Sequence, residues 1–428
     1  THPSHASFSR ILLTLISTTS CPYAWWAAQS WAVGEGAAGA ALSEFVSMGI
    51  GRFEGRQRFR ADQKNTAAIS PYLRFGELSA RTVLHRVHEE AWRESPTFLR
   101  RLAWRDLAIW SLWRFPTLPD RPFRPWFEEQ EWAAEGESLN AWRAGRTGYP
   151  LVDAAMAQLW HAGWMPNYMR HVVAGFLVEY LSLDWRHGER WFDYTLVDAD
   201  TAINAYMWQN GGHSGMDQWN FVMHPVYAAK SCDPDGDYVR RWLPQLARLP
   251  TEYIHCPWEA PYALRAAARV VLGDNYPHRG LTDLDAARRR SHAAVMAVRR
   301  GPGASQVLPS GHEWLALEGG HKVTLITRCD YREGTVTREG TYITGDDVVT
   351  RQTAEAKWDV RRRERTDDLS LAMRDSMRQA GGGGDGEDGG AAGGGKGRGR
   401  GRGRGGGRGP PRVQGAQRGV FTQPKPWG

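Results

Sequence analysis

The chain has 428 residues, 41 % of them hydrophobic, and a net charge of +7, a composition that suits one large core or two smaller ones. No apolar run approaches the roughly 18 residues that span a bilayer, which excludes a membrane-spanning protein. The four cysteines show neither a CxxC pair nor regular spacing, so the sequence indicates no disulfide framework or zinc site and favours an intracellular protein.

Residues 1–30 precede the first acidic residue, Glu35. This segment contains several Ser and Thr and one arginine, Arg10, and faintly resembles a transit peptide. Because the chain starts at Thr1, we interpret the segment as a truncated end and leave it unassigned. The nucleus is the favoured compartment, with the chloroplast and the cytoplasm as alternatives.

Helix-period apolar patterns fill the chain from Ser70 to about Val271, and strand-type alternation is almost absent there. The sequence SPYLRFGELSARTVLHRVHEEAW predicts a helix with a Ser70 cap and Pro71 at its first position. YPLVDAAMAQLWHAGW and NYMRHVVAGFLVEYL predict two more helices, separated by Gly163 and Pro166. The sequence therefore predicts an all-α domain of many helices.

The stretch LVDADTAINAYMWQNGG, residues 196–212, places polar groups on one stripe of a helix. Asp198 or Asp200 can cap this helix, and Asp200, Asn204 and Trp208 then follow one another at spacings of four. Capping plus an ordinary buried tryptophan explains this spacing when it is considered alone. A second segment, NTAAISPYLRFG, offers hydroxyls and backbone N–H groups at a helix start, where a phosphate is stabilised.

The C-terminal part differs in composition from the helical region. LDAARRRSHAAVMAVRR predicts a last basic helix within 281–300, and the linker-like GPGASQVLPSG places a boundary near residue 300. Residues 301–380 alternate polar and apolar residues in part, so we expect a few strands and a helix there. Residues 381–428 hold nine Lys or Arg, three acids and 21 of the 48 glycines, and we expect a disordered tail. A solvated tail is the simpler interpretation; arginine-mediated binding of nucleic acid or a partner protein is the alternative.

The motifs together resemble the FAD-binding helical domain of the cryptochrome and DNA photolyase family, almost continuously from about Trp31 to Pro277. The resemblance is carried by NTAAISPYLRFGELS, LAWRDLAIW, GRTGYPLVDAAMAQLWHAGWMPNYMRH, SLDWRHGERWF, LVDADTAINAYMWQ and DPDGDYVRRWLPQLARLPTEYIHCPWEAP. It implies one helical FAD-binding domain over residues 31–300.

The resemblance also implies a cofactor, FAD, and residues that hold it. The FAD phosphates would be held by Thr66, Ala67, Ala68, Ile69 and Ser70. Asn204 matches the position that faces flavin N5, and Arg170 would pair with Asp198 beside the flavin. The further cofactor contacts implied are Arg105, Asn167 and Asp200. Two departures remove hydroxyls that the family uses, because Phe53 replaces a tyrosine and Ala67 a hydroxyl residue, so we expect FAD to bind less tightly.

Three tryptophans match the family's electron relay, in which photoexcited flavin takes an electron from the nearest indole. The matched positions are Trp208, Trp185 and Trp132, and together with Asn204 they are the candidate catalytic residues. The other tryptophans, Trp164 among them, we interpret as core residues.

The positions that would contact damaged DNA depart from the repair enzymes. Trp104 is retained, but Arg101 stands where an acid is expected, Asn210 replaces a tryptophan and His171 replaces a methionine. Arginine can attract the DNA backbone but cannot accept a hydrogen bond from thymine. Pro166 stands where a histidine serves enzymes that repair six-four photoproducts, and proline cannot donate a proton. We therefore doubt both repair activities.

Family members normally carry an α/β domain with an antenna pigment before this region, and we expect neither the domain nor the pigment in this chain. The segment WAVGEGAAGAALSEFVSMGIGRFEG resembles the family's linker, so we expect a fragment of a longer protein. Three functions stay open. They are a cryptochrome-like blue-light receptor, a deoxyribodipyrimidine photo-lyase that cleaves pyrimidine dimers, and a flavin-free remnant that binds partners through its Arg/Gly-rich tail.

Overall fold

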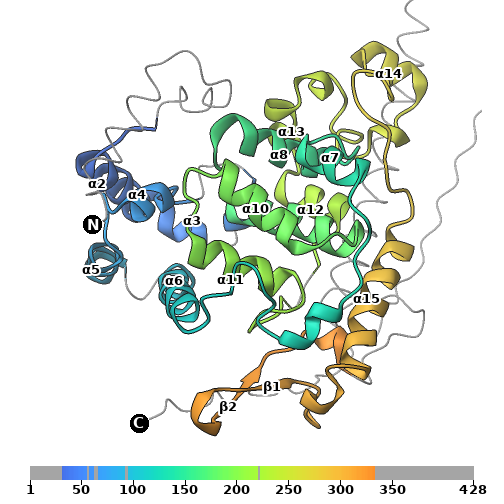
Figure 1. Cartoon of the computed structure of the whole chain (residues 1–428). Coiled ribbons are helices and arrows are strands. Elements are labelled where there is room, and N and C mark those ends of the chain that lie inside the picture. Colours follow the sequence, from blue (N-terminus) through green and yellow to red (C-terminus); the bar gives the residue numbers. More distant parts are fainter. Residues whose placement is uncertain (1–30, 55–56, 62–65, 92–94, 220–221, 333–428) are drawn as a thin grey trace, which may run out of the picture. The chain divides into compact units, whose positions relative to one another are not determined.

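The computed structural model describes residues 31–332 except 55–56, 62–65, 92–94 and 220–221 (Figure 1). The chain divides into two units, Thr1–Glu364 and Arg365–Gly428, and every described residue lies in the first. The expected tail at 381–428 therefore falls outside the described residues.

The described part is built almost entirely from helices, as the sequence predicts. The helices are α2 (Glu35–Glu44), α3 (Ile50–Glu54), α4 (Ser70–Phe75), α5 (Ala80–Ala91), α6 (Pro96–Arg114), α7 (Glu137–Arg143), α8 (Pro150–Ala162), α9 (Asn167–Gly175), α10 (Trp185–Thr195), α11 (Thr201–Gly211), α12 (Pro225–Cys232), α13 (Asp237–Trp242), α14 (Tyr262–Ala268) and α15 (Leu284–Arg300). Within the described ranges the one sheet is a hairpin of β1 (Glu313–Ala316) and β2 (Lys322–Leu325).

Helix α8 lies at the centre of the largest core because it is apolar on almost every side. Ten of its thirteen residues are buried, and the buried residues of α9 and α10 belong to the same core. Gly163 ends α8 in the left-handed conformation and Pro166 stands just before α9. Both helix boundaries confirm the predicted ones. The π-helical turn Phe176–Tyr180 then extends α9 toward α10.

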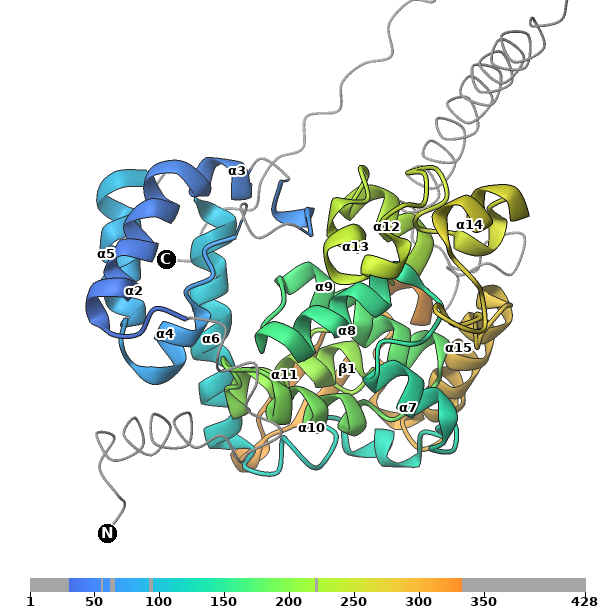
Figure 2. The ribbon, with the colours of Figure 1, turned by 90° about the horizontal axis from the view of Figure 1, so that it is seen from above.

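A second core joins α2, α4, α5 and α6, which Figure 2 shows gathered together. Phe53, at the position where the resemblance implies a tyrosine, packs edge-on against Phe45 and Phe98 in an aromatic cluster. The prediction that Ser70 caps α4 is wrong. Ser70 is the first residue of the helix and Ile69, which precedes it, offers no side-chain cap; the Ser70 hydroxyl accepts a hydrogen bond from Trp164 Nε1 at 3.1 Å.

A third core places the hairpin against the main helices. Leu325 of β2 is fully buried with Ala108 of α6 and Ala205 of α11 (Figure 1). Residues 313–325, expected in a C-terminal extension, thus share a core with the helices. Among the described helices none combines the length and the apolarity that a bilayer crossing requires.

Candidate functional site

The start of α11 is fixed by Asp200. Its Oδ1 accepts hydrogen bonds from the backbone N–H groups of Ala202 and Ile203, both at 3.1 Å. These donors have no partner inside the helix, and a carboxylate there also interacts favourably with the helix dipole. Of the two acids that could cap this helix, Asp200 is the cap and Asp198 is left for another role.

Asp198 pairs with Arg170, the pair that the resemblance implies. Arg170 Nη2 lies 2.7 Å from Asp198 Oδ2, and the Asp198 side chain is 2 % exposed. Arg170 Nε also donates to the Met165 carbonyl at 3.1 Å, which fixes the guanidinium. The second oxygen, Asp198 Oδ1, is buried and has no hydrogen-bond partner among the described residues. A buried acceptor left open is costly, so this oxygen suits a ligand that donates a hydrogen bond.

Asn204 is held by a partner that the sequence did not indicate. Its Nδ2 donates to the backbone carbonyl of Glu189 at 2.9 Å and to Glu189 Oε1 at 3.0 Å. Burial, followed by the charge of Asp193, raises the pKa of Glu189 to about 7. Glu189 lies on α10, fifteen residues before Asn204, and only the packing of α10 against α11 brings the two together.

Two of the three candidate relay tryptophans pack closely against glycines. Trp208 of α11 lies against Gly188 of α10, where an added Cβ would be 2.1 Å from its ring. Trp185 of α10 lies against Gly212, which ends α11, with a corresponding distance of 2.5 Å. The glycine at each helix leaves room for the indole of the other helix, and both rings are buried. Trp132 is half-buried at the edge of the same core.

The remaining cofactor candidates come from separate elements. Ala68 stands in the left-handed backbone region with φ 48°, just before α4. Asn167 begins α9 with an exposed side chain, and Arg105 is half-buried on α6. The described contacts join Arg170 to Asp198, and they do not join these three residues to that pair. The full candidate set, Thr66, Ala67, Ala68, Ile69, Ser70, Arg105, Asn167, Arg170, Asp198, Asp200 and Asn204, stays a prediction.

The candidate DNA-contacting residues differ in environment. Trp104 packs on Tyr206 of α11 with ring centroids 5.9 Å apart. Asn210 is buried, and its Oδ1 accepts from the Asp217 backbone N–H at 3.0 Å. It lines a small cavity together with His171 and Trp219. Burial lowers the pKa of His171 to about 3, helped by the charges of Arg101 and Arg170, so this imidazole is neutral.

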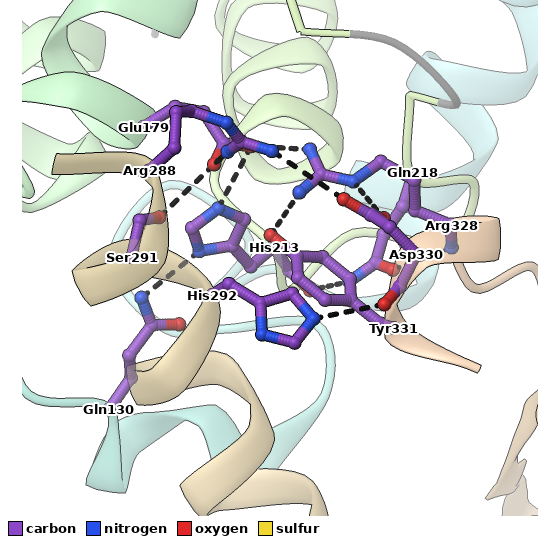
Figure 3. A network of polar contacts seen from close by, with 10 residues as sticks. All are labelled: Gln130, Glu179, His213, Gln218, Arg288, Ser291, His292, Arg328, Asp330 and Tyr331. Carbon is purple, nitrogen blue, oxygen red and sulfur yellow. Dashed lines mark hydrogen bonds and ion pairs between the residues drawn. The ribbon is translucent and has the colours of Figure 1, made fainter. Parts of the chain in front are cut away.

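A buried ionic network, absent from the sequence-based expectations, lies beside this cavity (Figure 3). Glu179 forms ion pairs with Arg288 of α15 and with Arg328, and both arginines also contact Asp330. Burial alone would raise the pKa of Glu179, but the two arginines hold that pKa well below its usual range. The members lie up to 151 residues apart in the chain, so no local pattern could reveal them. No group of three or more His, Cys, Asp or Glu within the described residues is placed to hold a metal ion.

Comparison with known proteins identifies what this arrangement is similar to. Residues 98–297 match the family described as the FAD binding domain of DNA photolyase. Cryptochrome-1 of Arabidopsis thaliana is 37 % identical over 281 residues, which are 63 % of this chain and 41 % of that protein. A deoxyribodipyrimidine photo-lyase of Agrobacterium fabrum is 39 % identical over 276 residues, 63 % of this chain and 57 % of that protein.

Solved structures give the same result. A bacterial class III photolyase from Agrobacterium tumefaciens has 37 % identity and a TM-score of 0.61, over 66 % of this chain and 60 % of that one. A cryptochrome from Synechocystis sp. PCC6803 has 28 % identity and a TM-score of 0.56, over 63 % of this chain and 56 % of that one. The chain spans about half the length of the curated relatives that it matches.

Proposed function

Because the chain belongs to the cryptochrome and DNA photolyase family, whose FAD-binding domain it contains, we propose that it is a blue-light-responsive flavoprotein of cryptochrome type. FAD is the cofactor of this domain family, and when bound it supplies the acceptor that takes an electron after absorbing blue light. The residues present fit FAD. Asp198 offers an open, buried acceptor, and Asn204 lies one helix turn beyond the Asp200 cap.

The observation that carries the proposal is the close packing of Trp208 on Gly188 and of Trp185 on Gly212, between α10 and α11. Electron transfer between indoles needs rings that keep a fixed distance and relax little when charged. Close packing on glycine removes free space around both rings. In the proposed relay Trp208 gives up an electron, and an electron from Trp185 then reduces the oxidised Trp208. An electron from Trp132 next reduces the oxidised Trp185, so the positive charge ends on the outermost, half-buried indole.

Cleavage of pyrimidine dimers in DNA is the second candidate function. It is supported by the photolyase relatives and by Trp104, which offers a stacking surface for a base. It is opposed by Arg101, which cannot accept a hydrogen bond from thymine, and by Asn210, whose side chain is buried in a backbone contact. DNA is thus a proposed partner of the second function and not of the first.

The rest of the organisation is also a proposal. We place the FAD-binding domain at residues 31–300, an extension at 301–380 and a disordered tail at 381–428, with binding of nucleic acid or a partner protein as the tail's alternative role. We place the protein in the nucleus, with the cytoplasm and the chloroplast as alternatives. A fluorescent fusion tests the compartment, and binding of RNA or DNA before and after removal of 381–428 tests the tail.

Trp185→Phe tests the relay. Phenylalanine keeps most of the packing but is much harder to oxidise, so photoreduction of bound FAD should slow by about tenfold or more while FAD stays bound. Trp258→Phe is the matched control, since Trp258 packs on Tyr149 and is outside the proposed relay. An unchanged photoreduction rate in Trp185→Phe would show that the relay assignment is wrong. Repair of dimer-containing DNA under blue light would favour the second function.

A further inference from the structure

The outermost relay tryptophan is covered by a histidine. The imidazole of His213 lies parallel to the indole of Trp132, with an angle of 6° and 5.8 Å between ring centroids. His213 is 2 % exposed and follows the end of α11. Its backbone is in the left-handed region with φ 72°, a conformation that a residue other than glycine adopts at a cost. The surrounding structure therefore holds the His213 backbone against its local preference.

Two polar partners lock the imidazole in one orientation. Its Nε2 lies 3.2 Å from Glu179 Oε1, and its Nδ1 lies 3.0 Å from Gln130 Nε2 (Figure 3). Nδ1 accepts a hydrogen bond from the Gln130 amide, which leaves the hydrogen on Nε2, and this N–H faces the Glu179 carboxylate at the distance of a close polar contact. One tautomer satisfies both contacts, and rotation of the ring off Trp132 would break both.

Burial is the main reason that this imidazole is uncharged. Burial lowers the pKa of His213; Glu179 counteracts this, and Arg328 and Arg288 act in the same direction as burial. The charges of the network also cancel, because the two arginines pair with the carboxylates of both Glu179 and Asp330. A neutral imidazole has an electron-rich face, and that face is turned toward Trp132.

We infer that His213 is a positioning residue for the oxidised state of Trp132, holding the indole in place and stabilising its positive charge through the stacked face. The inference rests on the proposed relay. One electron leaves Trp132 to refill Trp185, and the Trp132 indole keeps one positive charge until an electron returns or a thiol reductant supplies one. A desolvated cation over an aromatic face is stabilised, whereas a protonated imidazole there would repel it.

Two substitutions distinguish an effect of His213 on the relay from a purely structural role. Glutamine at this position keeps polar groups for Gln130 and Glu179 but has no ring. Phenylalanine keeps a ring against Trp132 but removes the acceptor of the Gln130 amide and the polar contact with Glu179. If His213 only stabilises the fold, His213→Phe is the more damaging change for every property. If the stacked face acts on the relay, stability and photochemistry respond in opposite orders.

The test follows the tryptophan radical by transient absorption after a blue flash on the full FAD-loaded chain, with unfolding in urea measured in parallel. We expect His213→Gln to shorten the lifetime of the charge-separated state by about threefold or more, the loss of one cation–π contact. We expect His213→Phe to keep most of that lifetime and to lose more stability. His161→Gln is the matched control, because His161 stacks on Trp242, which is outside the relay.

Two outcomes overturn the inference, and Trp132→Phe separates them. If Trp132→Phe slows photoreduction while His213→Gln leaves the lifetime unchanged, or shortens it less than His213→Phe does, the role of His213 is wrong and the relay stands. If Trp132→Phe photoreduces at the rate of the unchanged chain, the relay assignment fails, and the role of His213 fails with it.

Discussion

Single residues divide into those that a local pattern identifies and those that only the folded chain brings together. Asp200 could be predicted as a cap because caps depend on neighbours two and three residues away. The tryptophans and Asp198 were found through family resemblance. Glu189, Glu179 and His213 were missed, because their partners come from distant parts of the chain and no spacing marks them.

Substitution of Asp200 separates its capping role from its proposed cofactor role. Asp200→Ala removes the acceptor for two N–H groups, so the free energy of unfolding should fall by about 1 kcal/mol. Asp200→Asn keeps a capping oxygen and should stay within a few tenths of a kcal/mol of the unchanged chain, while FAD binding weakens if the charge matters. Urea unfolding and flavin titration measure the two effects. Equal stability loss in both variants would contradict the capping account.

The raised pKa of Glu189 leads us to expect that the free energy of unfolding depends on pH. Its pKa is about 7 in the folded chain against an ordinary value of 4.5, so between these values the folded state keeps a proton that the unfolded state has lost. The contribution of this group to stability is therefore full below about pH 4.5 and decreases as the pH rises to about 7. Glu189→Gln should flatten this part of the curve of unfolding free energy against pH. A curve with an unchanged slope would rule out the raised pKa.

At the scale of elements, helix boundaries were predictable where glycine and proline set them. Gly163 marks the end of α8 and Pro166 the start of α9, and the basic helix α15 lies where its pattern predicts it. Both strands have four residues and lie within 301–380, where a few strands were expected; β2 falls in the alternating stretch that begins at His321, and β1 lies before that stretch. Such short strands depend on burial against α6 and α11, which a sequence window does not contain.

The seating of the relay tryptophans predicts the effect of one added methyl group. In Gly188→Ala the new Cβ would be 2.1 Å from the Trp208 ring, so α10 and α11 must move apart, at a cost of about 1 to 3 kcal/mol in unfolding free energy. Photoreduction should also slow in Gly188→Ala, because the relay indoles move apart with the two helices. Gly36→Ala in α2 is the control, because no atom lies within 4 Å of its added Cβ, and it should be neutral or stabilising by roughly 0.4 to 1 kcal/mol. Equal stability changes in the two variants would contradict the packing.

At the scale of the molecule, a buried ionic network joins segments from three parts of the chain. Glu179 follows α9, Arg288 belongs to α15, and Arg328 with Asp330 follows β2. The sequence-based boundary near residue 300 rests on a Gly- and Pro-containing segment, which marks a turn but does not show whether the next elements pack on the same core. This is why the contribution of residues 313–331 could not be foreseen.

The network predicts a large effect from one substitution. Arg288→Met removes one of two cations that balance Glu179 and Asp330, leaving a net buried negative charge, and should cost about 3 to 5 kcal/mol in unfolding free energy. Arg289→Met, on the exposed side of the same helix, should change that value by less than about 0.5 kcal/mol. Unfolding in urea measures both. A small effect of Arg288→Met would show that the network contributes little to stability.

The central claim is that this chain binds FAD that blue light reduces. Its most direct test is the visible absorption spectrum of the purified chain, recorded before and after blue light with an added thiol reductant. The account predicts the absorption of oxidised flavin at the start and its loss on illumination. Oxidised flavin that is bound but unchanged by light, or no bound flavin after FAD is added, would contradict it.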